Sequence, residues 1–109
     1  MQRITVTERE DQSELSLQVG DELTVRLEAI PGAGYSWSVT GGVPDILSQI
    51  GEPAFERSGG RTLGGVEQQV FTFRVRSAGA QTLQLEYRRP WEKGGPAANS
   101  YSIKLTAEE

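Results

Sequence analysis

The sequence of 109 residues contains no cysteine and no histidine. The absence of cysteine excludes disulfide bonds, thiolate metal sites and a cysteine nucleophile. The absence of histidine excludes most zinc sites and every catalytic triad that uses an imidazole base. We therefore expect a protein that is not an enzyme and that holds no metal and no cofactor.

Positive charge is also scarce, since 11 Lys and Arg stand against 15 Asp and Glu. The net charge of −4 argues against a nucleic-acid partner, because binding to phosphates requires a basic face. No apolar run is long enough to span a bilayer, so we expect no membrane partner. Residues 1–6 enter a strand pattern without the hydrophobic region of a signal peptide. A cytoplasmic protein and one exported after removal of a signal both remain open.

What the sequence does contain is a series of short runs in which apolar and polar residues alternate, with 13 Gly and 5 Pro placed mainly between them. Such runs are typical of strands with one buried face, and no segment shows the pattern of a long amphipathic helix. We predict an all-β protein, an immunoglobulin-like β-sandwich of antiparallel strands, with residues 1–109 as a single monomeric domain. Residues 45–50 have apolar side chains at helical spacing and are predicted to form one turn of helix. The predicted strands are residues 3–7, 15–19, 23–29, 35–40, 54–57, 71–75, 83–87 and 101–105.

Residues 30–37 join a bend directly to a strand. Pro31 fixes its own φ, while Gly32 and Gly34 can take positive φ at little cost. The alternation that follows places Trp37, one of only two tryptophans, on the inward face. A loop mounted on a core strand is a good position for a recognition site, although an ordinary turn between strands has the same features.

Three segments of unusual composition are predicted to lie at one end of the sandwich. Each strand crosses the domain once, so successive loops alternate between its two ends. Residues 31–34, 58–65 and 89–99 follow every second strand and therefore share an end, as antibody recognition loops do. The third segment contains Trp91 outside any strand pattern. Its ring either caps the end of the core or is an exposed anchor for a partner.

Other kinds of site find little support. Residues 32–34 lack the third glycine and the helix of a dinucleotide loop, and residues 59–65 lack the Gly-Lys-Ser/Thr ending of a P-loop. The acidic groups at residues 8–11 and 108–109 are interpreted as solvated charges. A glycosidase pair is the alternative, but no cleft-forming architecture supports it.

The three loops resemble the motifs of one known family. Residues 85–91, Leu-Glu-Tyr-Arg-Arg-Pro-Trp, resemble the Arg-Pro-Trp motif of the chagasin family, the immunoglobulin-like inhibitors of papain-like cysteine peptidases. Pro31 followed by residues 34–37, Gly-Tyr-Ser-Trp, resembles the first motif of that family, Asn-Pro-Thr-Thr-Gly-Tyr/Phe followed by a tryptophan. Residues 62–65, Thr-Leu-Gly-Gly, stand where the family has Gly-x-Gly-Gly. The resemblance covers nearly the whole chain.

The chain departs from the family at four loop positions. Ile30 replaces the asparagine, Gly32 and Ala33 replace the two threonines, and Thr62 replaces the first glycine of the second motif. The first loop keeps its backbone signals but loses polar side chains, so we expect it to contribute shape and backbone contacts.

The resemblance implies a reversible inhibitor whose partners are papain-like cysteine peptidases. The first loop would enter the peptidase cleft, the second would offer backbone groups, and the third would pack on the other flank. The competing interpretation is an immunoglobulin-like adhesion or carbohydrate-binding module, which would expose aromatic residues on a sheet face. The residues implied to bind the peptidase are Pro31, Gly32, Ala33, Gly34, Leu63, Gly64, Gly65, Arg89, Pro90 and Trp91.

Overall fold

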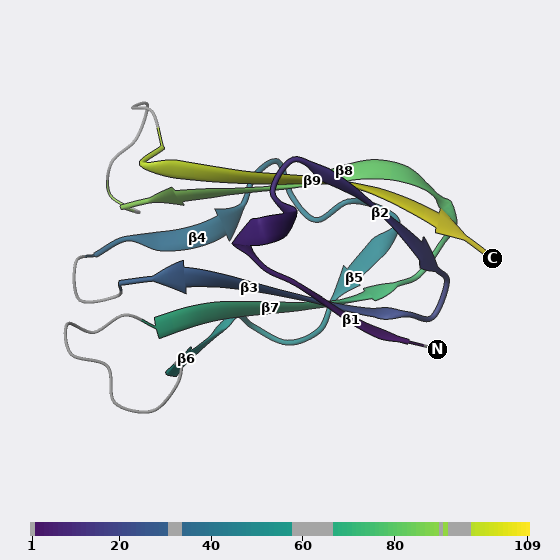
Figure 1. Ribbon diagram of the computed structural model, residues 1–109, viewed down its shortest axis with the longest axis horizontal. Coiled ribbons are helices and arrows are strands. Elements are labelled where there is room, and N and C mark those ends of the chain that lie inside the picture. Colours follow the sequence, from purple (N-terminus) through teal and green to yellow (C-terminus); the bar gives the residue numbers. More distant parts are fainter. Residues whose placement is uncertain (1, 31–33, 58–66, 90, 92–96) are drawn as a thin grey trace.

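The computed structural model describes residues 2–30, 34–57, 67–89, 91 and 97–109, which form two β-sheets packed face to face (Figure 1). Alternating side chains from both sheets fill the space between them, as the period-2 pattern requires. The elements are β1 (Arg3–Val6), η1 (Glu8–Glu10, a 3-10 turn), β2 (Ser13–Gln18), β3 (Glu22–Ala29), β4 (Ser36–Val39), β5 (Leu47–Gln49), β6 (Ala54–Arg57), β7 (Glu67–Val75), β8 (Gly79–Arg88) and β9 (Asn99–Glu108). Among the described residues, no helix is long and apolar enough to cross a membrane.

One sheet has the strand order β1-β3-β7-β5, with β6 also paired to β7, and the other has the order β2-β9-β8-β4. The predicted sandwich is confirmed, but its sheets are mixed. β1 lies parallel to β3, and β2 lies parallel to β9, while the remaining pairs are antiparallel. The turn η1 carries the chain from the first sheet to the second, so β1 and β2 each join an outer edge beside a strand of the same direction. Alternation shows which face of a strand is buried and not which strand lies beside it.

The core consists of the inward side chains of both sheets. Trp37 is only 5% exposed and packs among them, which confirms the predicted burial of this residue. Leu23, Leu27, Phe73 and Ile103 have no measurable exposure. Burial of this kind of side chain stabilises a fold by about 1.5–3 kcal/mol for each residue.

The segment predicted as a turn of helix is a strand instead. β5 pairs with the last part of β7, in the register Leu47 to Val75. A turn precedes it, in which the amide of Leu47 donates to the carbonyl of Pro44 at 2.9 Å. Ile46 and Leu47 are both buried, so the apolar spacing serves the sandwich core, and β7 offers backbone partners that an isolated helical turn lacks. The predicted edge strand at residues 54–57 is confirmed as β6.

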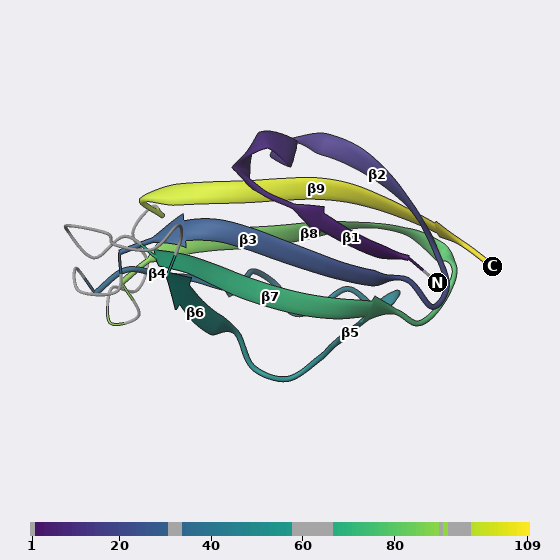
Figure 2. The ribbon, with the colours of Figure 1, turned by 60° about the horizontal axis from the view of Figure 1, so that its bottom comes forward.

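Six strand ends meet at one end of the sandwich, which we call the loop end (Figures 1 and 2). They are the last residues of β3, β6 and β8 and the first residues of β4, β7 and β9. The pairs Ala29 with Glu67, Arg57 with Glu67, Ser36 with Arg88, and Tyr87 with Asn99 place them there. The three predicted loops therefore leave from the same end. The opposite end, where β2 turns into β3 and β7 into β8, we call the turn end.

Candidate functional site

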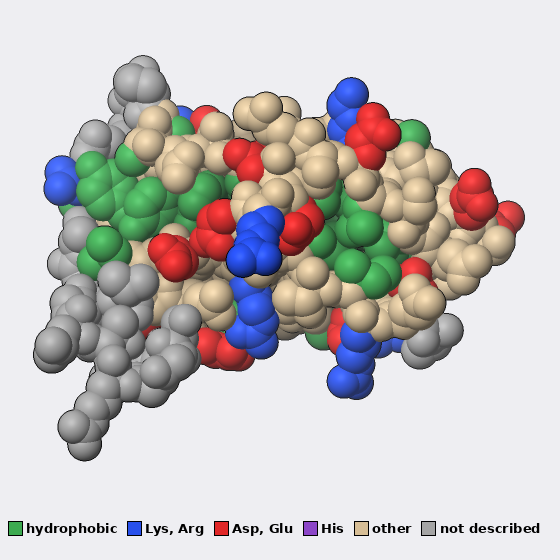
Figure 3. All heavy atoms as spheres, viewed as in Figure 1, with side chains coloured by type: hydrophobic (Ala, Val, Ile, Leu, Met, Phe, Trp, Pro, Cys, Tyr) green, Lys and Arg blue, Asp and Glu red, His purple; other side chains and the backbone are tan. Residues whose placement is uncertain are grey.

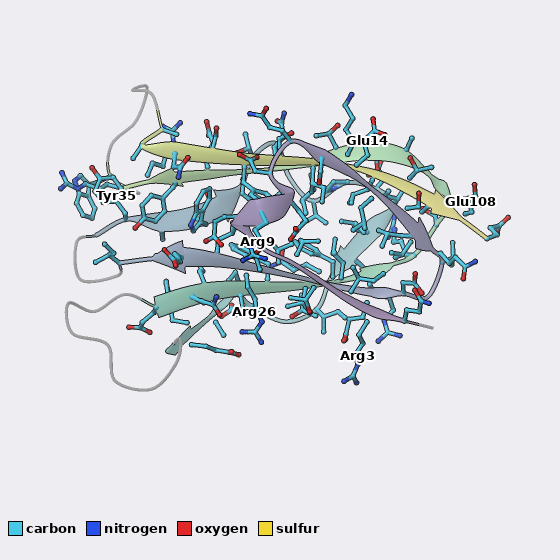
Figure 4. The ribbon with its side chains drawn as sticks, in the orientation of Figure 1. Arg3, Arg9, Glu14, Arg26, Tyr35 and Glu108 are labelled. Carbon is cyan, nitrogen blue, oxygen red and sulfur yellow. The ribbon has the colours of Figure 1, made fainter. Side chains whose placement is uncertain are left out.

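A column of stacked side chains runs from the core to the loop end. Trp37 and Tyr87 face each other across β4 and β8, with ring centroids 5.1 Å apart. Tyr87 stacks in turn on Tyr35 at 5.3 Å, and the guanidinium carbon of Arg89 lies 4.7 Å from the centre of the Tyr35 ring. Figure 4 shows Tyr35 at the outer end of the molecule. Stacked rings and a cation over a ring face are each favourable, so this aromatic column holds Arg89 against a rigid support.

Two hydrogen bonds connect the column to the end of β3. The backbone amide of Ile30 donates to the hydroxyl of Tyr87 at 2.9 Å. The indole Nε1 of Trp37 donates to the carbonyl of Glu28 at 3.0 Å. Both bonds link one sheet to the other, and both fall beside the first loop. The end of β3, from which the first loop starts, is therefore fixed to side chains of β4 and β8.

Trp91 contacts the first loop at Gly34. A Cβ added to Gly34 would lie 2.6 Å from Cη2 of the Trp91 indole, so the ring lies directly against the α-carbon of the glycine. Gly34 also has φ +85°, a conformation that side-chain-bearing residues adopt at a cost. A glycine is thus required here for its backbone angle and for the space it leaves to the ring. The contact joins the first and third predicted loops into one surface.

Trp91 is 67% exposed, the largest exposure of any bulky apolar residue in the part of the chain that the structure describes. A ring that capped the core would be buried, so of the two alternatives for this residue the exposed one agrees with the structure. Ile30 lies beside the same end and is 42% exposed. Figure 3 shows apolar side chains reaching the surface there, over the ends of β3 and β4. An exposed tryptophan of this kind is typical of a contact surface.

The structure brings together the three predicted site residues that it describes, namely Gly34, Arg89 and Trp91. Sequence reasoning missed Tyr87 as the support of the column and Gln69 as a buried polar residue of β7. Gln69 could have been found, because it shares the inward alternation of Phe71, Phe73 and Val75. The predicted site residues Pro31, Gly32, Ala33, Leu63, Gly64, Gly65 and Pro90 lie outside the described residues.

The described part of the loop end contains no arrangement suited to catalysis or metal binding. No group of three or more Asp or Glu side chains among the described residues could hold a metal ion. Two groups in the described part of the chain have shifted pKa values. Backbone amides of Gln18 and Gln2 lower the pKa of Asp21 at the turn end, and burial raises the pKa of Tyr101 in β9. What the described part of the loop end offers is a surface of aromatic, cationic and backbone groups.

The chain is similar to known proteins over most of its length. The model of the chagasin family peptidase inhibitors (I42) matches residues 16–105. Amoebiasin-2 of Entamoeba histolytica is 30% identical over 103 residues, which cover 92% of this chain and 83% of that protein. Chagasin of Trypanosoma cruzi is 26% identical over 105 residues, which cover 94% of this chain and 96% of chagasin.

Two solved structures share the fold. The crystal structure of the cysteine protease inhibitor EhICP2 from Entamoeba histolytica has a TM-score of 0.85 at 24% identity, covering 97% of this chain and 96% of the other. The structure of PbICP-C in complex with falcipain-2 has a TM-score of 0.62 at 22% identity, covering 96% and 88%. Because the family model spans most of the sequence, this chain belongs to the chagasin family of peptidase inhibitors.

Proposed function

We propose that the protein is a reversible inhibitor of papain-like cysteine peptidases that places its loop end in the active-site cleft. The observation that carries this proposal is the contact of Trp91 with Gly34, at the exposed end of a chagasin-family sandwich. The names of the relatives support the target class, since EhICP2 is a cysteine protease inhibitor and PbICP-C is seen in complex with falcipain-2.

We assign the three segments different parts of the interface. Residues 31–34 enter the cleft and contribute shape and backbone contacts. Residues 63–65 offer backbone groups for strand-like pairing with the peptidase, where glycine permits close approach. Residues 89–91 pack on the other flank, with Trp91 as the main apolar anchor.

Inhibition of this kind needs no chemistry from the inhibitor, which fits the absence of histidine and cysteine. Before any partner arrives, the aromatic column holds Arg89, and its two hydrogen bonds hold the end of β3, where the first loop starts. A preformed surface loses little conformational entropy when it binds, so tight binding does not require a covalent bond. The adhesion or carbohydrate-binding alternative is less well supported, because the most exposed aromatic residue described lies at a loop and not on a sheet face.

The test is a titration of papain with the protein, with trypsin as the serine peptidase control. We expect loss of papain activity and no loss of trypsin activity. Papain whose cysteine is blocked by a small alkyl group should still bind in a calorimeter or on a sensor surface, and the inhibitor should be recovered uncleaved. Inhibition that requires the free thiol and leaves a cleaved inhibitor would contradict the proposal.

A further inference from the structure

Gln69 is a polar residue in the core of the loop end. It lies on β7, in register with Leu27 in β3 on one side and with Phe55 in β6 on the other. Its side chain is only 4% exposed. A buried carboxamide is destabilising unless both its oxygen and its nitrogen form hydrogen bonds. The hydrogen-bond partners of the Gln69 carboxamide therefore indicate its structural role.

Both partners belong to the backbone of a single residue in the opposite sheet. The amide of Trp37 donates to Oε1 of Gln69 at 2.8 Å, and Nε2 of Gln69 donates to the carbonyl of Trp37 at 2.9 Å. The carboxamide thus pairs with Trp37 in the way that a neighbouring strand would.

The direction of the Trp37 peptide groups explains why this partner is needed. The amide of Thr40 donates to the carbonyl of Gln84 in β8 at 2.8 Å. Bonding alternates along an antiparallel pair, so Ser38 and Ser36 also turn their backbone groups toward β8, and Trp37 turns its own away. β4 is an edge strand, where such groups have no strand to pair with. Gln69 supplies the missing partner from the other sheet.

We infer that Gln69 is a positioning residue for the loop end, because it fixes β4 to β7 across the two sheets. β4 follows the first loop directly, and β7 follows residues 58–66. The pair of hydrogen bonds therefore sets the placement of the strand behind the first loop relative to the strand behind the second. This inference rests on the proposed function, in which both loops meet one peptidase surface.

Loss of a positioning residue is expected to change the rate of binding. Without the two hydrogen bonds between Gln69 and Trp37, β4 and β7 sample several relative positions, and only a fraction of molecules presents both loops correctly. The apparent affinity falls by that fraction, and the loss appears in the association rate. Loss of a direct contact, in contrast, mainly raises the dissociation rate.

The test uses Gln69→Met, which keeps the length and volume of the side chain and removes its hydrogen bonds. Its matched control is Gln81→Met. Oε1 of Gln81 accepts a hydrogen bond from the amide of Ile46 at 3.0 Å, away from the loop end. With alkylated papain on a sensor surface, we expect Gln69→Met to lower the association rate about tenfold, with a dissociation rate near that of the native protein. Gln81→Met should leave both rates unchanged. An unchanged association rate in folded Gln69→Met, or an equal fall in Gln81→Met, would overturn the inference.

A second variant applies if Gln69→Met does not fold. In Gln69→Glu, the protonated carboxyl can both donate and accept, as the carboxamide does, whereas the carboxylate only accepts and faces the Trp37 carbonyl. The residues in register with it, Leu27 and Phe55, carry no charge. We expect the association rate of the variant, divided by that of the native protein at the same pH, to rise between pH 7 and pH 4. A constant ratio would contradict the inference.

A measurement without peptidase separates this inference from the proposed function. The Trp37 amide should exchange with deuterium faster in Gln69→Met than in the native protein, and at the native rate in Gln81→Met. If native protein fails to bind papain, the proposed function is wrong, and the exchange rates still test whether the hydrogen bonds of Gln69 hold Trp37. If papain binds but the Trp37 amide exchanges equally in all three proteins, the positioning role is wrong.

Discussion

The two ends of the sandwich are held together by different means. At the turn end, backbone groups pair with one another, as the amide of Gly20 does with the carbonyl of Val75 and the amide of Val75 with the carbonyl of Asp21. The carboxylate of Asp21 accepts two further backbone amides, those of Gln2 at 3.0 Å and Gln18 at 2.9 Å. The segments of this end are thus tied directly to each other.

At the loop end, side chains make the ties from behind. The side chains of Tyr87, Trp37 and Gln69 each bond to the backbone of a segment next to the first loop. This arrangement fixes the bases of the loops and leaves Trp91 on the surface. The comparison teaches that the loop end is tied by side chains of the strands beneath it, whereas the turn end is tied by the backbone of its turns and by the carboxylate of Asp21 within one of them. Four variants test this difference.

The largest effect is expected from Trp37→Ala, which removes the inner member of the aromatic column. Truncation of a buried aromatic residue costs about 3–5 kcal/mol, because it leaves a cavity. Loss of the Nε1 bond to Glu28 adds to this. Urea unfolding should show a large fall in midpoint. A loss of less than about 1 kcal/mol in the free energy of unfolding would show that the column does not support the loop end.

Trp91→Ala should have the opposite profile. We expect an affinity loss on the order of 2 kcal/mol or more, in the range of interface hot spots, with a nearly unchanged melting temperature. The reason is that the ring is 67% exposed and lies outside the core. The inhibition constant for papain and a thermal melt measure both quantities. A large fall in melting temperature with unchanged inhibition would remove Trp91 from the site.

Gly34→Ala should weaken inhibition by displacing the Trp91 ring. The backbone conformation alone costs about 1–2 kcal/mol for a residue with a Cβ. The control is Gly41→Ala, since Gly41 has a similar φ of +75° but open space around its Cβ position. Iodide quenching of tryptophan fluorescence should change in Gly34→Ala and not in Gly41→Ala. Equal inhibition by the two variants would show that the contact with Trp91 is without effect.

The smallest effect on inhibition is expected at Asp21, which serves the turn end only. Its pKa is lowered in the folded state by the amides of Gln18 and Gln2. Its contribution to stability is therefore present above the pKa of an unfolded aspartate, about 4, and is lost as pH falls through the lower folded value. Asp21→Asn should lower the melting temperature at pH 7, and this difference should shrink below pH 4. Papain inhibition at pH 7 should not change, and a clear change would mean that the two ends are coupled.

Much of the framework could be predicted from the sequence. Alternation around Leu23 to Ala29 and around Trp37 determined which faces are buried, because the side-chain period of a strand is a local property. The order of the strands and turns then placed three loops at one end. The resemblance of residues 85–91 to a family motif indicated the third loop and its tryptophan.

The tertiary structure decided the features that depend on residues far apart in the chain. Nothing local shows that β1 and β2 join their sheets in parallel, or that residues 47–49 become a strand, because both depend on which backbone groups lie alongside. The same holds for the ring of Trp91 against Gly34 and for the carboxamide of Gln69 against Trp37. A sequence pattern indicates on which face of its strand each side chain lies, whereas these contacts exist only once two strands have packed together.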